Sequence, residues 1–282
     1  MNAIISFGRN LLHGALTLPF RRDRLLMKNN IRQSVCYGPF RSMPLDMVAK
    51  RFIEMGILGL DLVDPQEWEA VMQAGLQVTL SRVPGASGES LVNGFNHVEN
   101  HDKLTAIYGD LIPKAEKAGV KNLICFSGNR RSKSDDEGIR NCIKGFQRVV
   151  PIAERHGVTL IFELLNRMDH EDYHADRTAF GAEIARELGS EHFKLLYDIY
   201  HMQISEGNLI TTIQKNADVI GHYHTAGVPG RNDLDGEQEI NYPAVMRAIV
   251  QTGYKGFVAH EFATKKANEF EAIREAVKIC DV

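Results

Sequence analysis

Features that would indicate a membrane-embedded, disulfide-bonded or nucleic-acid-binding protein are scarce in this sequence. No run approaches 18 consecutive apolar residues, so we expect no transmembrane helix. The formal net charge of −3 lacks the basic excess that is typical of nucleic-acid-binding proteins. The 282 residues include only four cysteines, and none of them forms a C-x-x-C pair. This scarcity favours reduced, mostly buried thiols in a cytoplasmic enzyme over a disulfide framework.

The first thirty residues differ in composition from the rest of the chain. Residues 1–30 contain five basic residues but a single acid, Asp23. A basic, acid-poor segment is typical of a targeting sequence or of a surface-binding helix. The alternative is a loosely attached extension, or a stretch upstream of a start at Met27. We predict that residues 1–30 form a loosely attached N-terminal extension and that residues 31–282 form one domain.

From residue 31 onward, short β-rich runs alternate with longer helical patterns, and several of the helices end at a glycine. The predicted strands are Ile31–Tyr37, Gly59–Val63, Gln77–Ser81, Asn122–Phe126, Thr159–Leu164, Phe193–Asp198, Val219–His224 and Gly256–Glu261. The predicted helices are Pro44–Met55, Pro65–Ala74, His101–Ala118, Asp136–His156, Thr178–Leu188, Asn208–Lys215, Tyr242–Thr252 and Ala267–Cys280.

Eight strands that each precede a helix predict a single-domain (β/α)₈ TIM barrel of the α/β class. Strict alternation implies parallel strands with right-handed crossovers, and eight such units need about 250 residues. An open doubly wound sheet is the alternative, but no G-x-G-x-x-G fingerprint follows the first strand. We therefore expect no nucleotide cofactor. The longest loop region, Val83–Asn100, is expected to fold over the mouth of the barrel as a lid.

Four residues of metal-ligand type stand at the ends of the last four predicted strands. They are Glu163, Asp198, His224 and Glu261. A single acid at such a position commonly caps the next helix or pairs with a neighbour. The active site of a TIM barrel lies at the carboxyl ends of its strands, so four in succession favour a shared metal site. Three carboxylates and one imidazole suit Mn²⁺ or Mg²⁺ better than a structural zinc.

Several neighbouring polar residues are candidates for substrate binding. Arg231 is placed to bind an anionic group of the substrate through two hydrogen bonds, and His201 to bind a hydroxyl group. The alternatives are an arginine in solvent and a histidine at the start of a helix. Asn129 and Asp169 are further candidates, or ordinary loop residues. We expect His222 to face away from His224 and to be a structural histidine.

The segments "FELLN", "LLYDIYHMQISEG", "IGHYHTAGVPGR", "EINYPAVMRAI" and "GYKGFVAHEF" resemble the hydroxypyruvate isomerase branch of the xylose isomerase-like barrels, as do "FNHVENHDKL" and "CFSGNRR". The resemblance covers nearly all of residues 31–282. It implies a metal-dependent isomerase that interconverts hydroxypyruvate and tartronate semialdehyde or a similar 2-oxo acid pair. Glu163, Asp198, His224 and Glu261 would be the metal ligands, and the two glutamates would also act as acid and base. Hydroxypyruvate isomerases often have Gln at the position of His224, whereas His makes the chain similar also to ketose 3-epimerases.

Proton transfer between adjacent carbons explains why such a site needs two titratable groups and a cation. We expect Glu163 to be the base that attacks a ketone substrate. A ketose 3-epimerase would use the same residues. An endonuclease would need more His ligands and a basic groove, and a non-catalytic sugar-acid-binding protein would need no pair of glutamates. We expect a small-molecule substrate and neither nucleic acid nor a membrane as a partner. The sequence leaves open whether the protein is a homo-oligomer.

Overall fold

The computed structural model describes residue 28 and residues 30–85 and 89–282. Residues 1–27 and 29 of the predicted extension therefore lie outside the described part of the chain. At its edge, the backbone N–H of Lys28 donates a hydrogen bond to Asp281, and the side chain of Asn30 donates one to the carbonyl oxygen of Val282. The two ends of the described chain thus meet at the last helix. No helix among the described residues is long and apolar enough to span a membrane.

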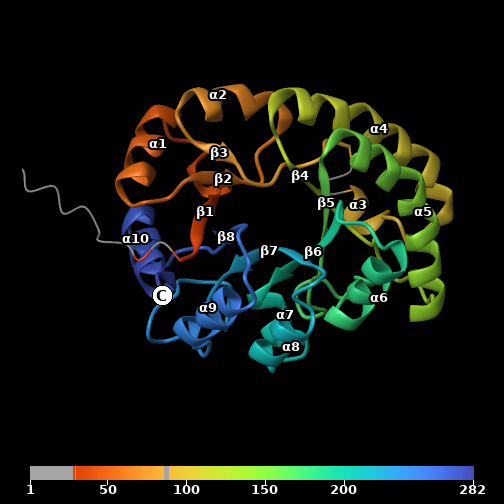
Figure 1. The fold of residues 1–282 in the computed structure, drawn as a ribbon. Helices are drawn as coiled ribbons and strands as arrows, with labels where there is room; N and C mark the ends of the chain where they lie inside the picture. The colour runs from red at the N-terminus through yellow and green to blue at the C-terminus, as the bar shows by residue number, and fades with distance from the viewer. Residues whose placement is uncertain (1–27, 29, 86–88) are drawn as a thin grey trace, which may run out of the picture.

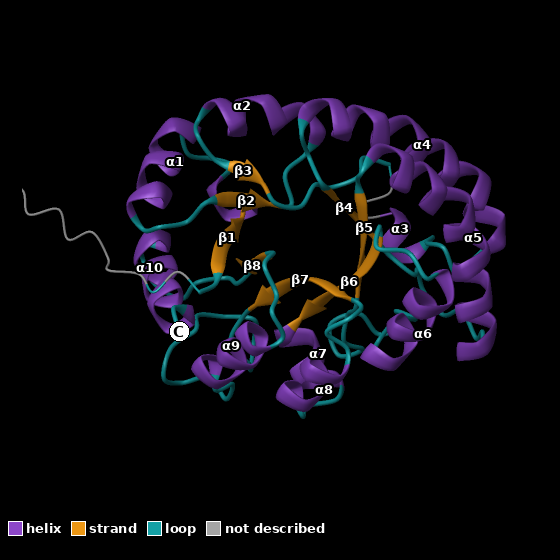
Figure 2. Ribbon diagram, viewed as in Figure 1, coloured by secondary structure: helices purple, strands orange, loops and turns teal. Residues whose placement is uncertain are grey.

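Eight parallel strands form the ring at the centre of the molecule, with the helices outside it (Figures 1 and 2). Their order is β3-β2-β1-β8-β7-β6-β5-β4. The ring closes between β3 and β4 at Ser81, whose N–H and carbonyl groups bond to Asn122 and Ile124. The strands are β1 (Arg32–Cys36), β2 (Gly59–Asp61), β3 (Gln77–Val78), β4 (Asn122–Cys125), β5 (Thr159–Glu163), β6 (Phe193–Asp198), β7 (Ile220–Thr225) and β8 (Phe257–His260).

The helices follow the strands in the alternation that the sequence predicts, so the single-domain (β/α)₈ TIM barrel is confirmed. The segment after β6 differs from the prediction, because α7 begins directly at the strand end and precedes the predicted helix. The helices are α1 (Leu45–Glu54), α2 (Trp68–Gln73), α3 (Glu89–Val92), α4 (His101–Ala118), α5 (Asp135–His156), α6 (Thr178–Leu188), α7 (Ile199–Ser205), α8 (Leu209–Lys215), α9 (Tyr242–Gln251) and α10 (Glu269–Cys280), with short 3₁₀ turns at Gly38–Phe40, Pro65–Glu67 and Val98–Asn100.

Glycine ends the long helices because the chain must turn sharply back into the barrel. Gly119 after α4 and Gly157 after α5 have φ values of 80° and 59°, in the left-handed region. Their N–H groups bond back to the last turn of the helix, and glycine adopts this conformation without a steric penalty. The next strand can therefore begin within a few residues of each helix end.

An aromatic cluster packs α5 against the strands that carry the candidate site. The ring of Phe146 in α5 stacks on Phe95 at a centroid distance of 4.0 Å and contacts Phe162 in β5 and Phe193 in β6. All four rings are buried. Each such ring contributes about 1.5–3 kcal/mol through burial alone. The cluster therefore fixes the two strands whose ends hold Glu163 and Asp198.

The loop region predicted as a lid is partly tied to the barrel. The N–H groups of Phe95 and Asn96 bond to the carbonyl oxygens of Phe126 and Ser127, beyond the end of β4. A side chain at Gly94 would meet this backbone at 2.4 Å, so close contact requires glycine there. The segment 94–96 is thus part of the rim, while Leu91 in the short α3 lines the cavity at the mouth. Movement of this loop region stays a prediction.

Candidate metal centre and active site

The four strand-end residues of the sequence prediction meet at one point in the barrel. Glu163 and Asp198 are the last residues of β5 and β6, His224 lies in β7, and Glu261 directly follows β8. One ligand atom from each of them lies within 4.8 Å of the others. Glu163, Asp198 and His224 are buried, while the Glu261 side chain is 25% exposed and faces the mouth. The site is therefore deep but open on one side.

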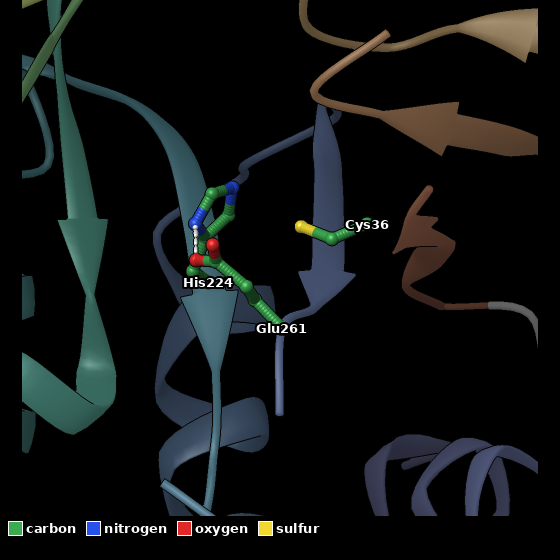
Figure 3. Close-up of side chains that lie close together, drawn as sticks. All are labelled: Cys36, His224 and Glu261. Carbon is green, nitrogen blue, oxygen red and sulfur yellow. Dashed lines mark hydrogen bonds and ion pairs between the residues drawn. The ribbon is translucent and has the colours of Figure 1, made fainter. Parts of the chain in front are cut away.

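The imidazole of His224 is fixed from both ends. Its Nδ1 lies 2.7 Å from a carboxylate oxygen of Glu261 (Figure 3) and 3.8 Å from one of Glu163. Its Nε2 lies 2.8 Å from Oδ2 of Asp61, the fully buried last residue of β2. When Asp61 accepts the Nε2 proton, the lone pair of Nδ1 is turned toward the three other candidate ligands.

Sequence reasoning missed Asp61 and misplaced His222. Residues two apart in a strand share a face, so the expectation that His222 faces away from His224 was wrong. The Nε2 of His222 lies 3.0 Å from the same oxygen of Asp61 that His224 contacts. The predicted strand Gly59–Val63 runs two residues beyond the observed end of β2 at Asp61, so the inspection of strand ends did not select this acid.

Arg231 lies inside the site rather than in solvent. Its guanidinium donates hydrogen bonds to Asp198 at 2.9 Å and to Glu261 at 2.6 Å. It also contacts the Nε2 of His201 and lies 5.1 Å from the centroid of the Tyr200 ring. Arg231 has a φ of 55°, and its loop is held by an antiparallel bridge between Gly227 and Asn232. Its role in substrate binding stays a prediction.

His201 and Asp169 belong to one hydrogen-bond network around Asn166. The Nδ1 of His201 accepts hydrogen bonds from the side chain of Asn166 at 2.7 Å and from its backbone N–H. Asp169 accepts hydrogen bonds from Asn166 at 3.0 Å and from the hydroxyl of Tyr200 at 2.8 Å. His201 lines the cavity described below. Asp169 is not part of that lining, and its carboxylate orients Asn166 and Tyr200 through the two hydrogen bonds.

The structure does not bring the predicted substrate-binding residue Asn129 to the cavity. Its carbonyl oxygen accepts a hydrogen bond from the side chain of Asn96 at 2.7 Å. The same oxygen lies 2.8 Å from the Nε2 of His97. Asn129 also forms an antiparallel bridge with Tyr173. The chain after β4 thus folds back along the loop that follows β5, which carries Asn129 away from the strand ends.

The two glutamates have opposite electrostatic environments. Burial raises the pKa of Glu163 to about 8, and the neighbouring carboxylate of Glu261 adds to the shift. Burial also acts to raise the pKa of Glu261, but Arg231 and His224 outweigh it and hold that pKa well below its usual value. The two pKa values are therefore shifted in opposite directions from their usual range. Such a split is typical of an acid and a base that act together.

The donor set fits a hard divalent cation. Three carboxylates supply oxygen ligands and His224 supplies a nitrogen, a combination that suits Mn²⁺ or Mg²⁺. The Arg231 guanidinium, which bridges Asp198 and Glu261, shows that this point of the structure attracts positive charge. Burial would lower the pKa of His224, but Glu261 and Asp61 raise it well above its usual value. The cluster is thus strongly anionic.

A cavity of about 460 Å³ opens above these residues. Its lining combines apolar side chains with Glu163, Glu261, His201 and Arg231, and it includes a second arginine, Arg82. This size lies within the ordinary range for small-molecule sites. A second hollow of about 660 Å³, over α6 and α8, contains none of the candidate ligands. The chemistry therefore belongs to the cavity at the strand ends.

Comparison with known proteins points to the same fold. The family model of the xylose isomerase-like TIM barrel matches residues 64–281. The 2-oxo-tetronate isomerase of Cupriavidus necator is 34% identical over 110 residues, 39% of this chain and 42% of that protein. The hydroxypyruvate isomerase of Escherichia coli strain K12 is 29% identical over 156 residues, 55% of this chain and 60% of that protein. Both alignments span less than two thirds of the relative. A structure described as an AP endonuclease, family 2, from Brucella melitensis shares the fold with a TM-score of 0.73 at 20% identity, covering 86% of this chain and 97% of that chain.

Proposed function

This chain belongs to the xylose isomerase-like TIM barrel family, and we propose that it is a metal-dependent isomerase of small 2-oxo acids or ketoses. Hydroxypyruvate, which would be converted to tartronate semialdehyde, is the first substrate to test. The observation that carries the proposal is the meeting of Glu163 and Glu261, with opposite pKa shifts, beside His224 and Asp198. The likeness to two curated 2-oxo acid isomerases supports the choice of substrate class.

The reaction moves a proton between two adjacent carbons of the substrate. One glutamate removes the proton from the carbon that bears the hydroxyl group, and the other delivers a proton to the former carbonyl carbon. The proton of that hydroxyl group passes to the former carbonyl oxygen, so the two oxygens exchange their roles. Glu163, Asp198, His224 and Glu261 would hold the cation, which when bound stabilises the negative charge that develops on the substrate oxygens. Arg231, at the cavity wall, would bind the carboxylate of a 2-oxo acid.

Proton–deuterium exchange at carbon, followed by NMR, tests this proposal. The protein with Mn²⁺ should introduce deuterium into hydroxypyruvate and form tartronate semialdehyde. Exhaustive chelation should abolish both signals, and added Mn²⁺ or Mg²⁺ should restore them. Full turnover by verified metal-free protein would refute the metal dependence. No exchange with any small 2-oxo acid or ketose would refute the isomerase itself.

A ketose 3-epimerase is the second candidate because the imidazole of His224 and the two glutamates suit it equally. The same exchange experiment separates the two reactions. An epimerase would place deuterium at carbon 3 of a ketose and would form the carbon-3 epimer, with the carbonyl group unmoved. An isomerase would move the carbonyl group to the neighbouring carbon.

A further inference from the structure

A cysteine lies beside the proposed metal centre and has no part in the reaction proposed above. Cys36 is the last residue of β1, and its side chain points toward Glu261 and His224 (Figure 3). Its sulfur, a nitrogen of His224 and a carboxylate oxygen of Glu261 lie within 4.8 Å of one another. The three residues come from β1, β7 and the end of β8, which are consecutive in the ring. Cys36 thus completes a second ligand set that overlaps the first.

The second set suits a different class of cation. Zinc lies about 2.3 Å from a cysteine sulfur and about 2.0–2.1 Å from a histidine nitrogen. A sulfur and a nitrogen ligand of one such ion are therefore at most about 4.4 Å apart, and the three atoms here lie within 4.8 Å of one another, close to that reach. Cysteine selects soft or borderline cations, whereas an oxygen-rich set such as the three carboxylates of the first site selects hard ones. Cys36 is 4% exposed and His224 fully buried, so an ion held there would be shielded from water.

We propose that Cys36, His224 and Glu261 bind a thiophilic divalent cation, represented by Cd²⁺ or Zn²⁺, and that this ion excludes the cation needed for isomerisation. Both ligand sets use His224 and Glu261, so we expect the two ions to compete for these shared ligands. When the thiophilic ion binds, the S–H bond of Cys36 breaks, a sulfur–metal bond forms, and the proton passes to solvent. The exclusion rests on the proposed function, whereas binding of the thiophilic ion does not.

Cadmium binding to the full-length protein tests the site directly. Cd²⁺ added to metal-free protein should produce the ultraviolet charge-transfer absorption of a cadmium–thiolate bond, which should saturate at one ion per chain. Cys36→Ser should lose this absorption and weaken Cd²⁺ binding by at least about tenfold. Cys280→Ser is the matched control, since Cys280 is another buried cysteine, in α10, and this variant should keep the absorption. Equal absorption in both variants, or none in the wild type, would overturn the proposal.

A second measurement needs no variant. Cadmium NMR of the wild-type complex should give the chemical shift of one sulfur ligand with nitrogen and oxygen ligands. A shift typical of oxygen ligands alone would overturn the proposal even if Cys36→Ser failed to fold.

Inhibition separates this inference from the proposed function. Cd²⁺ should inhibit the Mn²⁺-supported reaction, excess Mn²⁺ should relieve the inhibition, and Cys36→Ser should need at least about tenfold more Cd²⁺. If the protein isomerises no substrate, the proposed function fails while the thiolate absorption still reports the site. If the protein is active and the absorption is absent, the thiophilic site alone fails.

Discussion

Replacing Glu163 and Glu261 by Gln, one at a time, separates the two proposed proton-transfer roles. Gln keeps the shape of the side chain and one oxygen ligand but cannot accept a proton at neutral pH. If both residues transfer protons, each variant should lose about 10²- to 10⁴-fold in kcat. This loss corresponds to about 3–5 kcal/mol of transition-state stabilisation. A matched control is Glu116→Gln in α4, whose carboxylate is half exposed and contacts His156 at 2.6 Å.

The structure also predicts which variant keeps carbon–deuterium exchange. Sequence reasoning favours Glu163 as the attacking base. The opposite pKa shifts favour Glu261 as the base, because the raised pKa of Glu163 favours its proton-donating form and the lowered pKa of Glu261 favours its proton-accepting form. Glu261→Gln should therefore lose exchange together with turnover. Glu163→Gln should still introduce deuterium into the substrate while it forms little product.

The two variants should differ in metal binding as well. Glu261 contacts His224 at 2.7 Å and Arg231 at 2.6 Å, so its replacement disturbs two further residues of the site. Glu261→Gln should therefore weaken Mn²⁺ binding more than Glu163→Gln does, as measured by calorimetry. The reverse exchange pattern would show that the electrostatic assignment of the base is wrong. Wild-type kcat in either variant with metal bound would show that this glutamate is a ligand only.

Three further outcomes are expected. Asp61→Asn should weaken Mn²⁺ binding by about 10- to 100-fold, because the carboxylate orients His224; calorimetry that gives wild-type affinity would contradict this. A chain that begins at Met27 should keep the thermal midpoint and kcat of the full chain, and a large drop in either would contradict the predicted extension. Burial lowers the pKa of His260 from 6.5 to about 3, so its NMR signals should not titrate between pH 8 and pH 5. Since the unfolded chain alone takes up this proton, His260 should contribute stability above pH 6.5 that is lost as the pH falls toward 3. Titration of His260 near pH 6.5 would refute this.

The sequence predicted the barrel well because local signals agree with its topology. Glycine stops and short β-rich runs locate all eight strands, and the predicted and observed boundaries of Phe193–Asp198 coincide. The helix that follows this strand was missed for a local reason. Asp198 ends β6 and also caps α7 by accepting the N–H of Tyr200 at 2.9 Å, so no turn residues separate strand from helix. A search for loop signals therefore missed α7, whereas the predicted helix Asn208–Lys215 agrees with α8.

The cluster of candidate metal ligands was partly predictable because the topology alone brings strand ends together. Glu163, Asp198, His224 and Glu261 follow from that rule, whereas the position of Asn129 depends on how its loop folds back along the chain near Tyr173. Pairings of this kind depend on tertiary contacts that no local pattern encodes. The sequence left Arg231 either in the site or in solvent, and the fold of its loop decides between these two alternatives.

Asp61 and Cys36 show that the rule was applied too narrowly. The strand order β2-β1-β8-β7 places β1 beside β8 and β2 beside β1, although 163 positions separate Asp61 from His224 in sequence. Inspection of consecutive strand ends along the chain selects β5 to β8 and overlooks β1 and β2 on the other side of β8. Inspection of consecutive ends around the closed ring adds Asp61 and Cys36 beside Glu261 and His224. In a barrel the first and last strands are neighbours, so ligand searches gain from treating the strand order as circular.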